Sequence, residues 1–260
     1  MNITNYEEYI DIWIKIIHDI LSQSNYSYDN YNYTDSEWRI CSIKGEDDFV
    51  KNLLNTNYEP YSNDGVITIY KNIYNDDLFL AIPESRRSWY DFAIIYNKVF
   101  FPINIKISEW KTNDNLFWFK VLDYLLFWNF EEDNTWFRRI NQRKEEDGAF
   151  DLAEAINRKS WTINIEHPNF RINDIRDYFF LSINKSDNSV KVVPFLNIKR
   201  EDIWINPKNA FQSNLSTLWY EKSDDLDFKS NILKLAEMYY DYAEKKAKPF
   251  LILQWYYDFD

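Results

Sequence analysis

A carboxylate, an amide and an amine are spaced so that one β-hairpin would bring them together. Asp91 lies in the first of two β-rich runs, Asn104 and Lys106 lie in the second, and Asn97-Lys98 joins the runs. Asn tolerates the positive φ that two-residue hairpin turns need, so the pair predicts a tight turn that places Asp91 opposite Asn104. Because side chains alternate along a strand, Asn104 and Lys106 share one face, and Asp91 joins them from across the ladder.

The chemistry open to these three groups is metal-assisted hydrolysis of a phosphodiester. Carboxylate and carbonyl oxygens are the ligands that Mg²⁺ prefers, and a lysine beside them can steer or deprotonate a water molecule. The alternative is an ordinary half-buried hairpin whose polar face is merely solvated, because short motifs of this kind recur by chance.

The arrangement of an Asp, a spacer and (Asp/Glu)-x-Lys on a hairpin resembles the PD-(D/E)xK nuclease superfamily. Within that superfamily, Phe-Pro-Ile-Asn-Ile-Lys-Ile-Ser followed by Thr112-Asn113-Asp114-Asn115 is similar to type II restriction endonucleases. Two residues depart from the pattern: Tyr90 stands where the family often has proline, and Asn104 stands where the second acidic ligand usually sits.

The resemblance implies a Mg²⁺-dependent enzyme that cuts double-stranded DNA at a short palindromic site as a homodimer, since a two-fold protein matches a two-fold site. It also implies that Asp91 and the backbone carbonyl of Ile105 hold the metal, assisted by Asn104, and that Lys106 positions the attacking water.

A further carboxylate is needed to replace the acid missing at Asn104. Glu84 is the preferred candidate because it ends an expected strand close in sequence to Asp91, and Glu109 is another local candidate. Glu46 occupies a plausible place in an early helix, although an exposed acid that complements the helix dipole is the simpler explanation for it.

Composition excludes several other kinds of site. The three glycines of this 260-residue chain lie far apart, which excludes glycine-rich phosphate cradles, and no nucleotide cofactor is expected. Two histidines and one cysteine cannot supply a structural zinc site and leave little choice of Ser-His-Asp triad. The single Cys41 cannot form an internal disulfide, which fits a cytoplasmic location, and no run of about 18 apolar residues predicts a membrane span.

The formal net charge of −12 is the strongest argument against a DNA partner, because polyanion binding rests on neutralised phosphates. A binding cleft needs only local positive potential, however. Residues expected to contact DNA are of two kinds, basic residues near the hairpin and amide or lysine side chains of a later segment that can read base edges: Arg86, Arg87 and Lys111, then Asn206, Lys208, Asn209, Gln212 and Asn214. The alternative for the later segment is an Asn-Pro turn with no ligand.

The expected fold is α/β, with a restriction-endonuclease-like mixed central sheet flanked by helices in one nuclease domain over residues 1–260. Residues 1–60 would form a helical N-terminal part, 61–130 the catalytic hairpin and core, and 131–260 the recognition and dimerisation elements. Periodicity predicts helices from Asn5, with a Thr4–Glu7 capping box, and over 45–55, 116–129, 135–144, 151–158 and 225–248. Strands are expected over 65–70, 77–82, 161–165, 177–184, 189–196 and 250–257.

Two rival functions remain open at this point. One is a non-enzymatic binding or scaffold protein with an acidic, tyrosine-rich surface. The other is a repair or transposon-type nuclease of the same superfamily, which would cut branched, damaged or end-bearing DNA.

Overall fold

A mixed seven-stranded β-sheet organises the part of the chain that the structure describes. The structure, a computed structural model, describes residues 5–23, 46, 48–54, 57–84, 90–108, 113–117, 121, 124–125, 175–184, 189–198, 202–206, 210–214, 228–235 and 237. The strand order is β1-β2-β3-β4-β5-β7-β8. Neighbouring strands are antiparallel except for β5 and β7, which are parallel. The expected α/β class with a mixed sheet is therefore confirmed.

The strands of this sheet are β1 (Tyr58–Asn63), β2 (Ile67–Asn72), β3 (Leu78–Pro83), β4 (Phe92–Tyr96), β5 (Val99–Ser108), β7 (Phe179–Asn184) and β8 (Val190–Pro194). A 3₁₀ turn, η4 (Phe195–Asn197), follows β8. The strands expected over 65–70, 77–82, 177–184 and 189–196 are confirmed within a few residues. Strand β1 was not predicted.

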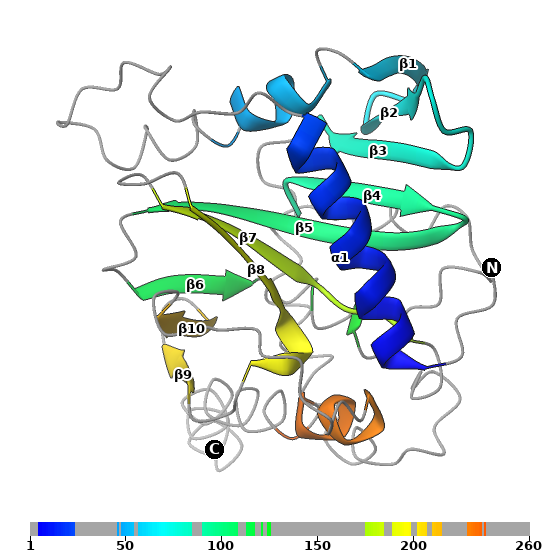
Figure 1. The fold of residues 1–260 in the computed structure, drawn as a ribbon. Helices are drawn as coiled ribbons and strands as arrows, with labels where there is room; N and C mark the ends of the chain where they lie inside the picture. The colour runs from blue at the N-terminus through cyan, green and yellow to red at the C-terminus, as the bar shows by residue number, and fades with distance from the viewer. Residues whose placement is uncertain are drawn as a thin grey trace, which may run out of the picture.

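The helix α1 (Tyr6–Gln23) lies across one face of this sheet (Figure 1). Its first turn is capped by Asn5, whose Oδ1 accepts a hydrogen bond from the Glu8 N–H at 2.8 Å. Asn5 therefore caps the helix, and Thr4 of the expected Thr4–Glu7 capping box lies outside the described residues. The buried face of α1 consists of Tyr6, Tyr9, Ile10, Trp13, Ile16, Ile17 and Ile20.

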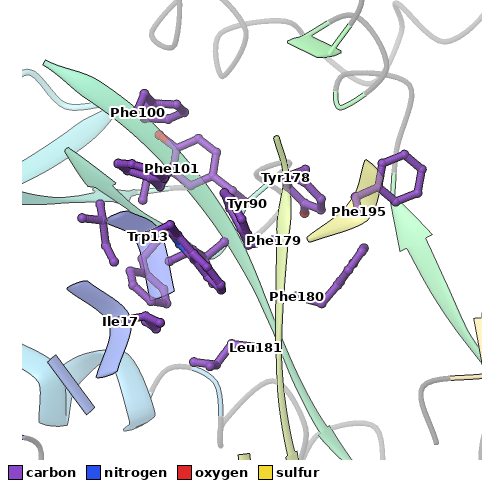
Figure 2. Packing of buried hydrophobic residues seen from close by; sticks show 14 of the residues in the cluster. Trp13, Ile17, Tyr90, Phe100, Phe101, Tyr178, Phe179, Phe180, Leu181 and Phe195 are labelled. Carbon is purple, nitrogen blue, oxygen red and sulfur yellow. The ribbon is translucent and has the colours of Figure 1, made fainter. Parts of the chain in front are cut away.

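Aromatic stacking joins α1 to the central strands. The Trp13 ring stacks on Phe179 of β7 with centroids 3.9 Å apart, and the Tyr9 ring stacks on Phe101 of β5 at 4.9 Å. Figure 2 shows Trp13 and Ile17 on one side of β7, and Tyr178 and Phe180 on the other. Aromatic residues therefore occupy both faces of the central strands.

The opposite face of the sheet carries a second set of aromatic residues. Tyr90 and Tyr124 both make edge contacts with Phe100 of β5, at centroid distances of 5.7 and 6.1 Å. A helix was expected over 116–129, packed on the hairpin face that carries Phe92, but α1 takes that place. Residues 121, 124 and 125 are helical and buried, which fits the expectation of a helix buried on most sides, and the other positions from 118 to 129 lie outside the described residues.

A buried polar network ties the start of α1 to the start of β7. The Asp177 carboxylate is fully buried and accepts hydrogen bonds from the Tyr6 hydroxyl and from the backbone N–H groups of Tyr178 and Leu196. Burial raises the pKa of Asp177 to about 7, although these hydrogen bonds act in the opposite direction.

A second sheet has three strands in the order β6 (Asn113–Phe117), β10 (Ala210–Asn214) and β9 (Ile203–Asn206). The segment that contains β6 was expected to be a polar connection running into a helix, and that expectation is wrong. Its β-structure comes from pairing with β10, which lies almost one hundred residues later in the chain.

The remaining described helices fit the periodicity in part. Residues 48–54 are helical and bury Phe49, Val50 and Leu53, and residues 228–235 are helical and bury Phe228, Ile232 and Leu235. The elements expected over 135–144, 151–158, 161–165 and 250–257 lie outside the described residues. No described helix is both long enough and apolar enough to span a membrane.

Candidate functional site

The hairpin forms around Asn97 and Lys98 as its turn chemistry predicts. Both residues have positive φ, 50° and 68°, which is the conformation of a type I′ turn. The register runs from Tyr96 opposite Val99 to Phe92 opposite Ile103, so Asp91 follows at the level of Asn104. The predicted hairpin and its register are confirmed.

Two hydrogen bonds hold Asp91 at the edge of β5, just before the first paired residue of β4. Its backbone N–H donates to the Ile103 carbonyl at 2.9 Å, and its carboxylate Oδ2 accepts from the Ile105 N–H at 2.6 Å. Because the N–H and C=O of one strand residue point to the same side, the Ile105 carbonyl faces the same edge as Asp91. The two metal ligands implied by the resemblance, the Asp91 carboxylate and this carbonyl, therefore lie at one edge of β5.

Tyr90 fixes the chain immediately before Asp91. Its side chain is fully buried and packs edge-on against Phe100, whose ring lies on the same face of β5 as Asn104. A packed aromatic residue thus stands where the nucleases that the sequence resembles often have proline.

The Asn104 side chain meets Tyr178, a residue that the sequence did not single out. Asn104 pairs with Phe180 of β7, and Tyr178 lies two residues earlier on the same face. The Asn104 amide is hydrogen bonded to the Tyr178 hydroxyl, whereas its Oδ1 is buried and has no hydrogen-bond partner among the described residues.

Glu46 belongs to the same electrostatic environment as Asp91. Burial raises the pKa of Tyr178 well above its usual value, and the negative charges of Asp91 and then Glu46 raise it further. Two carboxylates from different elements therefore act on one hydroxyl. Glu46 is half-buried in a helical position just before residues 48–54.

The Glu84 carboxylate is hydrogen bonded to residues of β1 and β2. Its Oε1 accepts hydrogen bonds from the Thr68 hydroxyl of β2 and from Asn63 Nδ2 of β1, the latter at 3.1 Å. These contacts hold the carboxylate toward the outer strands rather than toward Asp91. We therefore prefer Glu46 over Glu84 as the additional acid, and Glu109 lies outside the described residues.

Lys106 begins a row of polar side chains across three strands. It pairs with Ser182 of β7, and Ser182 pairs with Lys191 of β8, so all three occupy the face that also carries Asn104. With neighbouring strands about 4.8 Å apart, the two lysines have Cα atoms roughly 10 Å apart. Burial lowers the pKa of Lys191, and this second cation was not predicted.

The second sheet gathers amide residues from two distant segments. Asn113 pairs with Asn214 and Asn115 pairs with Gln212, so the register places these four residues on one face. The other face carries Ser213, which is fully buried. Four residues separate Ser108 from Asn113, so the ends of β5 and β6 lie within about 18 Å of each other.

The remaining expected DNA contacts are placed only in part. Asn206 ends β9 and pairs with Ala210 of β10. Arg86, Arg87, Lys111, Lys208 and Asn209 lie outside the described residues. For these five residues the expected DNA contact remains a prediction.

The described residues contain no group of three or more His, Cys, Asp or Glu side chains arranged to hold a metal. Any cation at the hairpin would therefore depend on amide and backbone oxygens as well as on Asp91 and Glu46. Neither the protein-family models nor the curated proteins compared with this chain match it.

Proposed function

We propose that this protein is a Mg²⁺-dependent endonuclease that hydrolyses phosphodiester bonds in double-stranded DNA, of the type II restriction class. The observation that carries the proposal is the hairpin edge, where the Asp91 carboxylate and the backbone of Ile105 meet beside Asn104 and Lys106. This is the trio of groups that the PD-(D/E)xK resemblance requires, with an amide replacing one acid.

The architecture supports a restriction-endonuclease-like fold. The hairpin lies inside a mixed sheet, its second strand is parallel to β7, and α1 covers one face (Figure 1). A rigid sheet with covered faces holds side chains at a strand edge more precisely than a loop would.

The oxygen atoms at the hairpin edge fit a hard divalent cation. Asp91, the Ile105 carbonyl and Asn104 Oδ1 would hold Mg²⁺, with Glu46 as the additional carboxylate. Asn104 Oδ1 has no hydrogen-bond partner within the described part of the chain, which supports this donor set, because buried polar atoms in proteins nearly always have a partner. When bound, Mg²⁺ would supply positive charge at the scissile phosphate and lower the pKa of a bound water.

The lysines provide the remaining groups for phosphate chemistry. In the proposed reaction Lys106 orients the attacking water and offers positive charge as the phosphate gains negative charge. Lys191, two strands further out on β8, binds the DNA backbone near the reacting phosphate. The two residues supply local positive potential on a chain whose net charge is −12.

The amide face of the second sheet is the proposed reading surface. Asn and Gln side chains bind adenine bidentately in the major groove, and β-strands can enter that groove. Gln212 and Asn214 share this face with Asn113 and Asn115, and β6 is tethered to the hairpin by four residues. A homodimer would place two such faces on the two halves of a palindromic site.

Digestion of plasmid and phage DNA with Mg²⁺ tests the proposal against its rivals. We expect discrete fragments with a common end sequence, and no fragments from Asp91→Ala, which removes the carboxylate at the hairpin edge. Cutting confined to branched or end-bearing DNA would instead indicate the repair-type nuclease. No metal-dependent cutting of any DNA would favour the scaffold protein.

A further inference from the structure

The two ends of the Asn104 side-chain amide differ in their hydrogen bonding. Its amide nitrogen meets the Tyr178 hydroxyl, and its Oδ1 is buried with no hydrogen-bond partner among the described residues. The two ends of an amide are chemically different, because the oxygen can bind a cation and the NH₂ group cannot. Rotation of the amide group by half a turn would exchange the positions of the oxygen and the NH₂ group.

Tyr178 is held firmly enough to select one of these orientations. Its side chain is fully buried, and its ring packs edge-on against Phe180 with centroids 5.4 Å apart. Its backbone N–H donates to Asp177 Oδ1 at 2.7 Å, and its carbonyl accepts from the Phe195 N–H at 2.8 Å. The position of the hydroxyl is therefore restricted by burial, by the ring contact with Phe180 and by the two backbone hydrogen bonds of Tyr178.

The surrounding charges favour a hydroxyl that accepts from the amide. Asp91 and Glu46 both act on Tyr178, and their negative charge attracts the phenolic proton. The oxygen lone pairs are then left for the Asn104 NH₂ group. In the reversed orientation the NH₂ group, which cannot bind a cation, would take the place of Oδ1.

We propose that Tyr178 is a positioning residue that orients the Asn104 amide, so that Oδ1 faces the cation position beside Asp91 and the Ile105 carbonyl. This inference rests on the proposed function, since it assigns Tyr178 a task in the same site. The chain would thereby compensate for the amide at position 104, because a carboxylate has two equivalent oxygens and needs no such selection.

Calorimetric titration of the full-length protein with Mn²⁺, without DNA, tests this orientation. Four proteins are compared: wild type, Tyr178→Phe, Asn104→Asp and the double variant. We expect Tyr178→Phe to raise the Kd for Mn²⁺ about 10-fold when residue 104 is Asn, as loss of an outer-shell partner does. In the Asn104→Asp background the same change should raise the Kd less than about twofold, because either carboxylate oxygen can serve.

Tyr6→Phe is the matched control, because it also removes a buried hydroxyl but acts on Asp177. We expect it to leave the Kd for Mn²⁺ unchanged. Thermal unfolding without metal checks that Tyr178→Phe folds. An equal effect of Tyr178→Phe in both backgrounds, or no effect in either, would overturn the inference.

The inference and the nuclease proposal can fail separately. If wild type does not cut DNA but the effect on Mn²⁺ binding depends on residue 104, the orienting role stands and the nuclease does not. If wild type cuts DNA but Tyr178→Phe changes Mn²⁺ binding equally in both backgrounds, the nuclease proposal stands and the orienting role does not. Absence of Mn²⁺ binding by the wild type would overturn both.

Discussion

Asn104 is the residue at which the proposed site departs from the acidic pattern of the nucleases that the sequence resembles. An amide oxygen can bind a divalent cation but brings no negative charge, so position 104 contributes one negative charge fewer than the acid usually found there in the nucleases that the sequence resembles. Two features would allow an amide to serve at this position: Oδ1 is buried with no hydrogen-bond partner among the residues that the structure describes, and the amide is hydrogen bonded to Tyr178.

Restoring the acid should therefore strengthen metal binding. We expect Asn104→Asp to lower the Mg²⁺ concentration for half-maximal cleavage about 10-fold, because ligand charge tunes the affinity of hard cations. Titration of the plasmid cleavage rate with Mg²⁺ checks this. An unchanged or higher Mg²⁺ requirement would show that Oδ1 does not face the cation.

Lys191 should contribute to DNA binding without contributing to base recognition. We expect Lys191→Ala to weaken binding to all DNA sequences to a similar degree and to reduce the slope of log Kd against log salt by about 1. Fluorescence anisotropy with a cognate and a scrambled duplex in Ca²⁺ measures both quantities. A loss confined to the cognate duplex would contradict a phosphate contact.

Elements with local sequence signals, such as turn residues, could be predicted. Strands that form only by pairing with another segment of the chain could not. The hairpin was predictable because Asn97 and Lys98 carry its turn chemistry and the flanking strands are continuous in sequence. Strand β1 was missed because it is mostly exposed and contains Glu59, Pro60 and Asn63, which are poor strand formers. Its conformation comes from pairing with β2.

The turn itself offers a test at this scale. Lys98 has a φ of 68°, a conformation that costs a side-chain-bearing residue energy and costs glycine almost none. We expect Lys98→Gly to raise the free energy of unfolding by about 1 kcal/mol, since Asn-Gly is the favoured type I′ pair. Urea unfolding measures this, and destabilisation would contradict the assigned turn.

The junction of α1 with β7 should make stability depend on pH. Burial raises the pKa of Asp177 from 3.8 to about 7, so the folded protein binds more protons than the unfolded chain between those values. This residue therefore lowers the free energy of unfolding as pH rises toward 7. Between pH 5 and pH 8 the loss is roughly 2 kcal/mol.

Asp177→Asn isolates that contribution, because it keeps an acceptor for the backbone N–H groups and cannot ionise. We expect the variant to gain stability relative to wild type as pH rises from 5 to 8. Urea unfolding at several pH values provides the comparison. A stability difference that is independent of pH would show that Asp177 keeps the same protonation state throughout.

At the scale of the whole molecule, the candidate site was predictable only on the hairpin. Asp91, Asn104, Ile105 and Lys106 are neighbours through one turn, so strand alternation brings them together. Tyr178 and Lys191 reach the site through pairing of β5 with β7, whose partners lie 76 residues apart. The nearly continuous apolar run from Tyr178 to Ile183 indicated a buried strand, but nothing local indicated its neighbour.

The negative net charge also has its meaning at this scale. A chain with a net charge of −12 repels DNA on average, so specific binding must depend on local clusters such as the row from Lys106 to Lys191. The proposed binding should accordingly be more sensitive to loss of Lys191 than to loss of Lys98 at the exposed hairpin turn.

The most direct test of the account is the rate of Mg²⁺-dependent plasmid cleavage by wild type, Lys106→Ala and Lys98→Gly. Both variants remove one lysine from the same hairpin, but only Lys106 lies on the face that carries Asn104. We predict that Lys106→Ala slows cleavage roughly 100- to 1,000-fold while DNA binding survives, and that Lys98→Gly cuts like wild type. Undiminished cleavage by purified Lys106→Ala would contradict the assignment of this hairpin as the active site.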